Sequence, residues 1–289
     1  MSHLSGAAAG SGLRAATAPS RDHPPPPPTW RDTVAAEGLK LRAMRATRVM
    51  SWLGPILGMA LCVLVAIAVG IDSDDWSGQD RAEFDPLQFS LLSGLVSGVL
   101  LTVLGVLAGA SEYRTGLVRV TLTVTPRRGR VLLAKVIVVA VLSWVGFTAV
   151  ALLATLAVQP VFHAYGLPGL TTADLDAGDE VRSLGTAIGL APVFPLIGLA
   201  LALLTRSTAG GVTSVLGLLF APEIAAGLLP SWYADHVLIY LPGPATDSIS
   251  LTGADAAGHL HLAVAVLVVA AWLTLFLSAA HRSLQRRDA

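Results

Sequence analysis

The residue types that enzymes use for chemistry occur in this sequence, but without the spacing that the chemistry needs. A P-loop requires a Gly-Lys pair before Ser or Thr, and neither of the two lysines, Lys40 and Lys135, follows a glycine. There is also no H-E-x-x-H metal motif and no G-x-S-x-G nucleophile motif. The sequence therefore predicts a chain that is not an enzyme and holds no ATP, cofactor or metal of its own.

Two smaller clusters could bind a metal ion, but each has a simpler interpretation. His259 and His261 are two positions apart and would project to different sides of a helix, which favours a place at a helix end. Four aspartates could hold a cation loosely, although they are more typical of a solvated loop: Asp72, Asp74, Asp75 and Asp80.

The composition places the chain in a membrane. Charged residues make up 13%, hydrophobic residues 54%, and the mean hydropathy is +0.68, whereas soluble domains carry about 25% charged residues. The 19 basic and 19 acidic residues balance, so there is no net positive charge to attract nucleic acid.

Long apolar segments form most of the framework of the chain. Six stretches of 23, 26, 38, 23, 16 and 26 residues contain no Asp, Glu, Lys or Arg, and a membrane-spanning helix needs about 20 residues. The 38-residue stretch counts as one span because prolines and glycines follow its first part. The prediction is an all-α polytopic protein with a Pro-rich disordered tail over 1–30 and one transmembrane domain over 31–285. The spans are predicted at about 50–71, 87–110, 133–158, 184–204, 209–229 and 259–281.

Charge asymmetry orients these six spans. The segments on one predicted side carry 17 basic and 5 acidic residues, and those on the other side carry 2 and 14. By the positive-inside rule the basic side, with both termini, is cytoplasmic, which predicts a multi-pass protein of the cytoplasmic membrane.

The segment before the last span is irregular. Pro222 favours a helix break that leaves Glu223 near the outer surface, with a buried carboxylate as the alternative. Trp232, Tyr233 and Tyr240 are typical of membrane-interface anchors. We expect short re-entrant or interfacial helices here.

Small residues recur at helical spacing in the second span. Glycines at i and i+4 let helix backbones approach closely in lipid. Internal helix packing and a seam between two copies both fit the four glycines: Gly94, Gly98, Gly105 and Gly109.

Two predicted cytoplasmic segments combine charged and apolar residues. The first, 31–50, has the pattern of an amphipathic helix at the membrane surface. The second, 111–135, has a short apolar part between charged ends. It fits either a docking element for a soluble partner or a basic turn that only sets orientation.

These segments carry a resemblance to the ABC type-2 transporter permease family, the membrane subunits of ATP-driven exporters. The matching residues before the first span are Glu37, Lys40, Leu41, Arg42 and Arg45. Those after the second span are Ser111, Glu112, Tyr113, Thr115, Gly116, Pro126, Arg127, Arg128 and Lys135. Leu229, Pro230, Trp232 and Tyr233 also look similar.

The resemblance implies that a separate ATP-binding subunit supplies the ATPase site, and that a second permease subunit, like or unlike, completes the transporter. The 111–135 loop would be the coupling element that docks on the ATPase, through Glu112, Tyr113, Thr115, Gly116, Arg119, Pro126, Arg127 and Arg128. The N-terminal helix would flank the same subunit through Glu37, Lys40, Arg42 and Arg45. No residue indicates which substrate is exported.

The sequence is also compatible with two other functions. An ion-coupled secondary carrier would depend on Glu223, but the scarcity of other ionisable residues in the spans argues against it. A non-transporting membrane scaffold or immunity protein would bind a partner through its loops and move no substrate.

Overall fold

The computed structural model describes residues 29–115, 128–169, 178–250 and 259–287. These residues form helices and turns and no β-strand, as predicted for an all-α chain. The longer helices are α1 (Trp30–Ala43), α2 (Arg45–Asp72), α5 (Ser93–Thr115), α7 (Arg128–Ala164), α9 (Gly178–Leu190), α10 (Val193–Thr205), α11 (Thr208–Leu228) and α14 (Leu262–Arg287). The short ones are η1 (Ser73–Asp75), α3 (Gly78–Glu83), α4 (Pro86–Leu91), α12 (Ser231–His236), η2 (Leu238–Tyr240) and α13 (Pro242–Ser250). The predicted tail lies outside the described residues, except for Thr29 and Trp30.

The described helices indicate a multi-pass membrane protein. Five segments are long and apolar enough to cross a bilayer: Arg45–Asp75, Ser93–Ser111, Gly129–Ala164, Leu184–Thr205 and Leu262–Arg286. They correspond to five of the six predicted spans. The predicted span at 209–229 is not among them, because the apolar part of α11 covers only Thr208–Pro222.

The predicted helix break at Pro222 is wrong. Helix α11 continues through this proline to Leu228, and the Pro222 side chain is buried. A proline inside a helix removes one hydrogen bond, whereas a full break leaves several backbone groups without helical partners. In an apolar environment the continuous helix is therefore the less costly arrangement.

Two predicted spans are interrupted where the sequence analysis expected continuous helices. The span at 87–110 divides at Leu92, between α4 and α5, and the span at 184–204 divides at Ala191 and Pro192, between α9 and α10. Pro192 disfavours helical geometry in the residue before it, which explains the second interruption. The 38-residue stretch is crossed by one helix, α7, as predicted, although α7 extends past Pro160 to Ala164.

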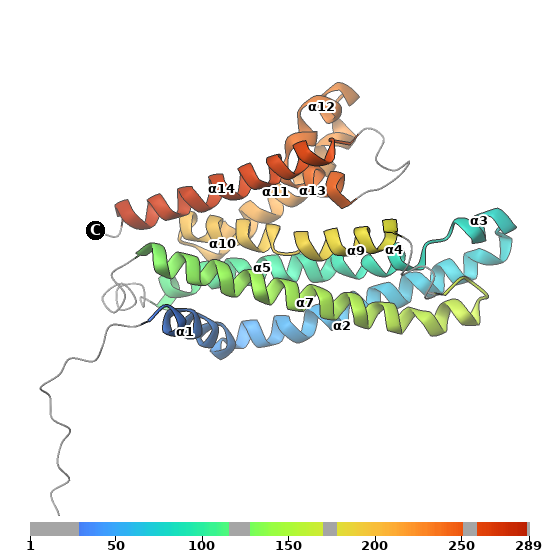
Figure 1. The fold of residues 1–289 in the computed structure, drawn as a ribbon, viewed down its shortest axis with the longest axis horizontal. Helices are drawn as coiled ribbons and strands as arrows, with labels where there is room; N and C mark the ends of the chain where they lie inside the picture. Colours follow the sequence, from blue (N-terminus) through green and yellow to red (C-terminus); the bar gives the residue numbers. More distant parts are fainter. Residues whose placement is uncertain (1–28, 116–127, 170–177, 251–258, 288–289) are drawn as a thin grey trace, which may run out of the picture.

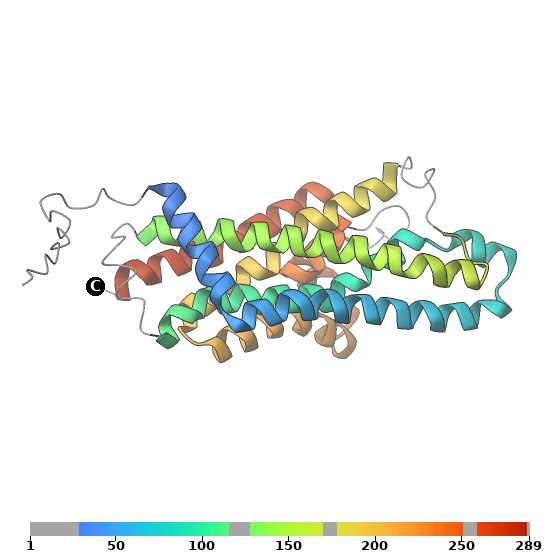
Figure 2. The same ribbon diagram turned by 90° about the horizontal axis from the view of Figure 1, so that it is seen from below.

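The long helices lie roughly side by side in an elongated bundle (Figure 1). Helices α5 and α10 pack closely in its interior, with α2 and α7 on one side and α11 and α14 on the other (Figures 1 and 2). Short helices α12 and α13 precede α14, as expected for this segment, and the buried Ala245 and Ile249 anchor α13 in the core. Three buried clusters hold the helices together, and two of them share helix α10.

Candidate functional site

Segments that are far apart in the sequence meet at one end of the bundle. Figures 1 and 2 show α1, the last turns of α5, the first turns of α7 and the end of α14 together there, with the turn between α10 and α11 beside them. We call this the docking end. It brings together α1 and the two described ends of the segment 111–135.

Helix α1 begins with a complete N-terminal cap. The Thr29 hydroxyl donates to Asp32 Oδ2 at 2.6 Å, and the Asp32 backbone amide donates to the Thr29 hydroxyl oxygen at 3.3 Å. The Thr29 hydrogen bonds hold the pKa of the Asp32 carboxyl below its ordinary value. The cap therefore contributes fully to stability at pH values above the ordinary pKa of an aspartate. This contribution is lost as the pH falls through the lowered pKa of Asp32.

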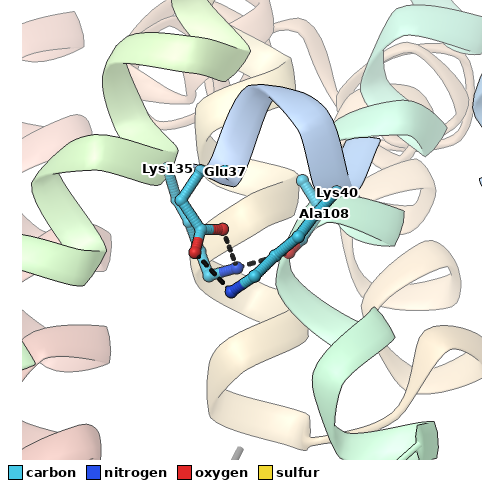
Figure 3. Close-up of polar contacts among 4 residues, drawn as sticks. All are labelled: Glu37, Lys40, Ala108 and Lys135. Carbon is cyan, nitrogen blue, oxygen red and sulfur yellow. Dashed lines mark hydrogen bonds and ion pairs between the residues drawn. The ribbon is translucent and has the colours of Figure 1, made fainter. Parts of the chain in front are cut away.

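A buried ion pair holds α1 against the bundle (Figure 3). Lys135 Nζ of α7 lies 2.6 Å from Glu37 Oε2 of α1, and the two side chains are only 7% and 5% exposed. The other carboxylate oxygen of Glu37 accepts from Lys40 Nζ at 2.7 Å. Lys135 Nζ also donates to the backbone oxygen of Ala108 at 3.4 Å. One ammonium group thus connects α1, α5 and α7.

Apolar and aromatic contacts reinforce this attachment. Leu41 of α1 is buried in the same cluster as Ala108, Leu132 and Leu284, which come from α5, α7 and α14. Near the start of α1, the guanidinium carbon of Arg130 lies 5.9 Å from the centre of the Trp30 ring. Helix α1 is therefore an integral part of the bundle as well as a surface helix.

The N-terminal residues predicted to bind a partner divide into two groups. Arg42 and Arg45 are exposed, and Lys40 is partly exposed beside them. Glu37, in contrast, is 3% exposed and faces the bundle. The sequence pattern did not reveal this inward orientation. An acid four positions before the apolar Leu41, together with a lysine at the edge of an apolar segment, was the signal that could have suggested the pair.

The segment 111–135, predicted to be a coupling element, is described only at its two ends. Glu112, Tyr113 and Thr115 lie in the last turns of α5, and Arg128 begins α7. The other predicted docking residues, Gly116, Arg119, Pro126 and Arg127, lie outside the described residues.

Arg206 is a residue of the docking end that the sequence analysis did not select. Its backbone is left-handed, with φ of 53°, and it ends α10 by donating its amide to the Ala202 oxygen at 2.9 Å. Its guanidinium carbon lies 5.5 Å from the centre of the Tyr113 ring. This contact connects the end of α5 to the turn between α10 and α11.

The four glycines of the second span have different surroundings. A Cβ at Gly105 would collide with the backbone oxygen of Pro195 in α10, and a Cβ at Gly109 with that of Leu199. A Cβ at Gly94 would meet the ring of Phe147 in α7. These three glycines therefore serve packing within the chain. At Gly98, a Cβ would have nothing within 4 Å.

No protein-family model matches this chain, and no curated protein matches it.

Proposed function

We propose that the protein is the membrane-spanning permease subunit of an ATP-driven exporter. The attachment of α1 to α7 at the docking end supports this function best. A partner that moves α1 would also move α7 through Glu37 and Lys135, and α7 extends over 37 residues toward the opposite end of the bundle. The arrangement suits the transmission of a movement from a soluble partner to the spans.

In this proposal α11 is the sixth span. In Figures 1 and 2, α10 and α14 both end at the docking end, so the chain must return to the opposite end between them. Helix α11 has 21 residues and a length of roughly 30 Å, which is about the thickness of the bilayer core. With six spans, both termini and the docking end would lie on the basic cytoplasmic side.

The partners in this proposal are an ABC ATP-binding subunit, which binds and hydrolyses ATP, and a second permease subunit. The ATPase would contact the exposed Arg42 and Arg45, the end of α5 and the connection between α5 and α7. This chain would contribute no catalytic group. It would provide the path through the cytoplasmic membrane and the surface on which the ATPase acts.

Cysteine labelling tests the proposed orientation. In a Cys62→Ser background, we expect Asp74→Cys to react with a membrane-impermeant maleimide in intact cells. We expect Ala209→Cys to react only after permeabilisation, because it lies beside the α10–α11 turn. Both positions are exposed, whereas the neighbouring Ser73 is buried and would label poorly at either side. The reverse pattern of labelling would invert the topology.

Coupling is tested in the complex purified with its ATPase. We expect Glu112→Ala together with Arg119→Ala to reduce ATP-driven export at least tenfold, which corresponds to about 1.4 kcal/mol of coupling. The control is Asp74→Ala with Asp75→Ala at the opposite end, which should leave export unchanged. Export is measured in proteoliposomes, and samples with ATP inside are compared with samples with ATP outside.

Three results would count against the function. Unchanged export in the Glu112/Arg119 variant would refute the coupling role. Transport by the chain alone, driven by an ion gradient, would identify a secondary carrier. The absence of any co-purifying ATP-binding protein and of any transport would favour a membrane scaffold.

A further inference from the structure

A cavity of about 490 Å³ lies between the helices in the half of the bundle away from the docking end. Its walls come from the first half of α5, from α7, from the α9–α10 junction, and from α11 and α13. Its volume is in the range of sites that hold drug-sized molecules. None of the contacts at the docking end involves it.

Aromatic rings are part of the cavity wall. Phe147 of α7, Phe194 of α10 and Phe220 of α11 all line it, so three helices each contribute one ring. The faces of aromatic rings carry partial negative charge and attract cations, particularly where water is excluded. The apolar wall therefore favours a hydrophobic ligand and does not repel a positively charged one.

The single ionisable side chain among the described residues that line the cavity is acidic. It is Asp247 of α13, a helix anchored in the core by its buried neighbours Ala245 and Ile249. Its side chain is exposed, so a ligand in the cavity can reach the carboxylate. Its charge complements a positively charged group and repels an anion.

The hydroxyl groups of the lining make hydrogen bonds within their own helices. Thr102 donates to the Gly98 oxygen at 2.8 Å, Thr246 to the Gly243 oxygen at 2.6 Å, and Ser250 to the Thr246 oxygen at 3.2 Å. These donors are therefore engaged with backbone oxygens. An anionic or sugar-like ligand would need such donors, and a hydrophobic cation would not.

We infer that this cavity binds a hydrophobic organic cation, with its apolar body against the three phenylalanine rings and its positive charge near Asp247. The site itself stands on the cavity alone. The statement that such a cation is the exported substrate rests on the proposed function.

The test measures binding of tetraphenylphosphonium to the full chain in phosphatidylcholine nanodiscs, without nucleotide or partner. We expect saturable binding of radiolabelled tetraphenylphosphonium, about one per chain, that unlabelled tetraphenylphosphonium displaces. Tetraphenylborate, which has the same shape and the opposite charge, should not displace it. Displacement by both ions alike, or the absence of saturable binding, would overturn the inference.

Two variants locate the site. Asp247→Asn should weaken tetraphenylphosphonium binding about fivefold, as expected for the loss of a partly exposed charge pair. Gly98→Leu should weaken it further by filling the cavity, because its side chain enters open space. Asp74→Asn, which removes an exposed carboxylate outside the cavity, should bind like the wild type. Unchanged affinity in Asp247→Asn would place the cation elsewhere and refute the site.

The binding result and the export result are independent. If tetraphenylphosphonium binds as expected but the complex exports nothing with ATP, the proposed function fails and the site remains. If export is confirmed but the Asp247 and Gly98 variants bind normally, the function remains and this site is wrong.

Discussion

Replacing Lys135 with methionine should destabilise the protein by about 3 kcal/mol. The change removes the ammonium group that lies 2.6 Å from Glu37 and leaves the carboxylate, which is only 5% exposed, without its buried partner. A buried charge that loses its partner keeps the full cost of its desolvation. The measurement is the apparent free energy of unfolding in a mixed-detergent titration, followed by tryptophan fluorescence.

Two controls separate the buried pair from ordinary surface electrostatics. Lys40→Met removes the other cation on Glu37, but Lys40 is 39% exposed, so we expect a loss of less than about 1 kcal/mol. Glu37→Met combined with Lys135→Met removes both buried charges and should recover most of the stability lost in Lys135→Met. Equal effects of the Lys40 and Lys135 substitutions would show that the Glu37–Lys135 pair contributes no more than a surface contact.

The same variants also report on the proposed coupling. If α1 transmits movement through the ion pair, the complex of the Lys135→Met variant should hydrolyse ATP while exporting less per ATP. The double Met variant restores packing but not the charged connection. It should therefore recover stability more fully than it recovers export.

Replacing Gly105 with alanine should cost about 3 kcal/mol or more. A Cβ at this position collides with the carbonyl group of Pro195, which is backbone and cannot move aside as a side chain can. The helices α5 and α10 must therefore separate, and the buried contacts between them weaken. The yield of folded protein by size-exclusion chromatography and the detergent titration both measure this effect.

Gly98→Ala is the matched control, since it makes the same change on the same helix. Nothing lies within 4 Å of the added Cβ, and alanine is favoured over glycine inside a helix by about 0.5–1 kcal/mol. We expect Gly98→Ala to be neutral or slightly stabilising. A similar loss of stability at both positions would mean that close contact with α10 is not the reason for glycine at position 105.

The positions of the long helices could largely be predicted from the sequence, whereas their interruptions could not. Charge-free stretches located α2, α7 and α14 well, because no charged side chain is tolerated along a lipid-facing helix. The turn at Leu92 has only the Ser93-Gly94 pair after it as a local signal, and glycines recur throughout this span. At Pro222 the sequence gives a strong local signal for a helix break, yet α11 continues through it. The cost of exposing helical backbone groups in an apolar environment outweighs the effect of the proline.

The sequence indicated segments that meet at the docking end, but not the orientation of their side chains. The basic residues marked the segments that gather at the docking end. The periodicity of α1 could not show that Glu37 faces inward, because its partner Lys135 lies 98 positions away in the chain. The same limit applies to the cavity, where Phe147, Phe194, Phe220 and Asp247 come from four different helices.

The sequence alone predicts a helical membrane protein, because lipid rejects charge and unpaired backbone groups wherever they occur along the chain. The fold reveals which glycines touch another helix, which acid pairs with Lys135, and which side chains enclose the cavity. This difference arises because hydropathy and charge act on each segment separately. Packing, ion pairs and cavities depend instead on distances between segments, which no local pattern contains.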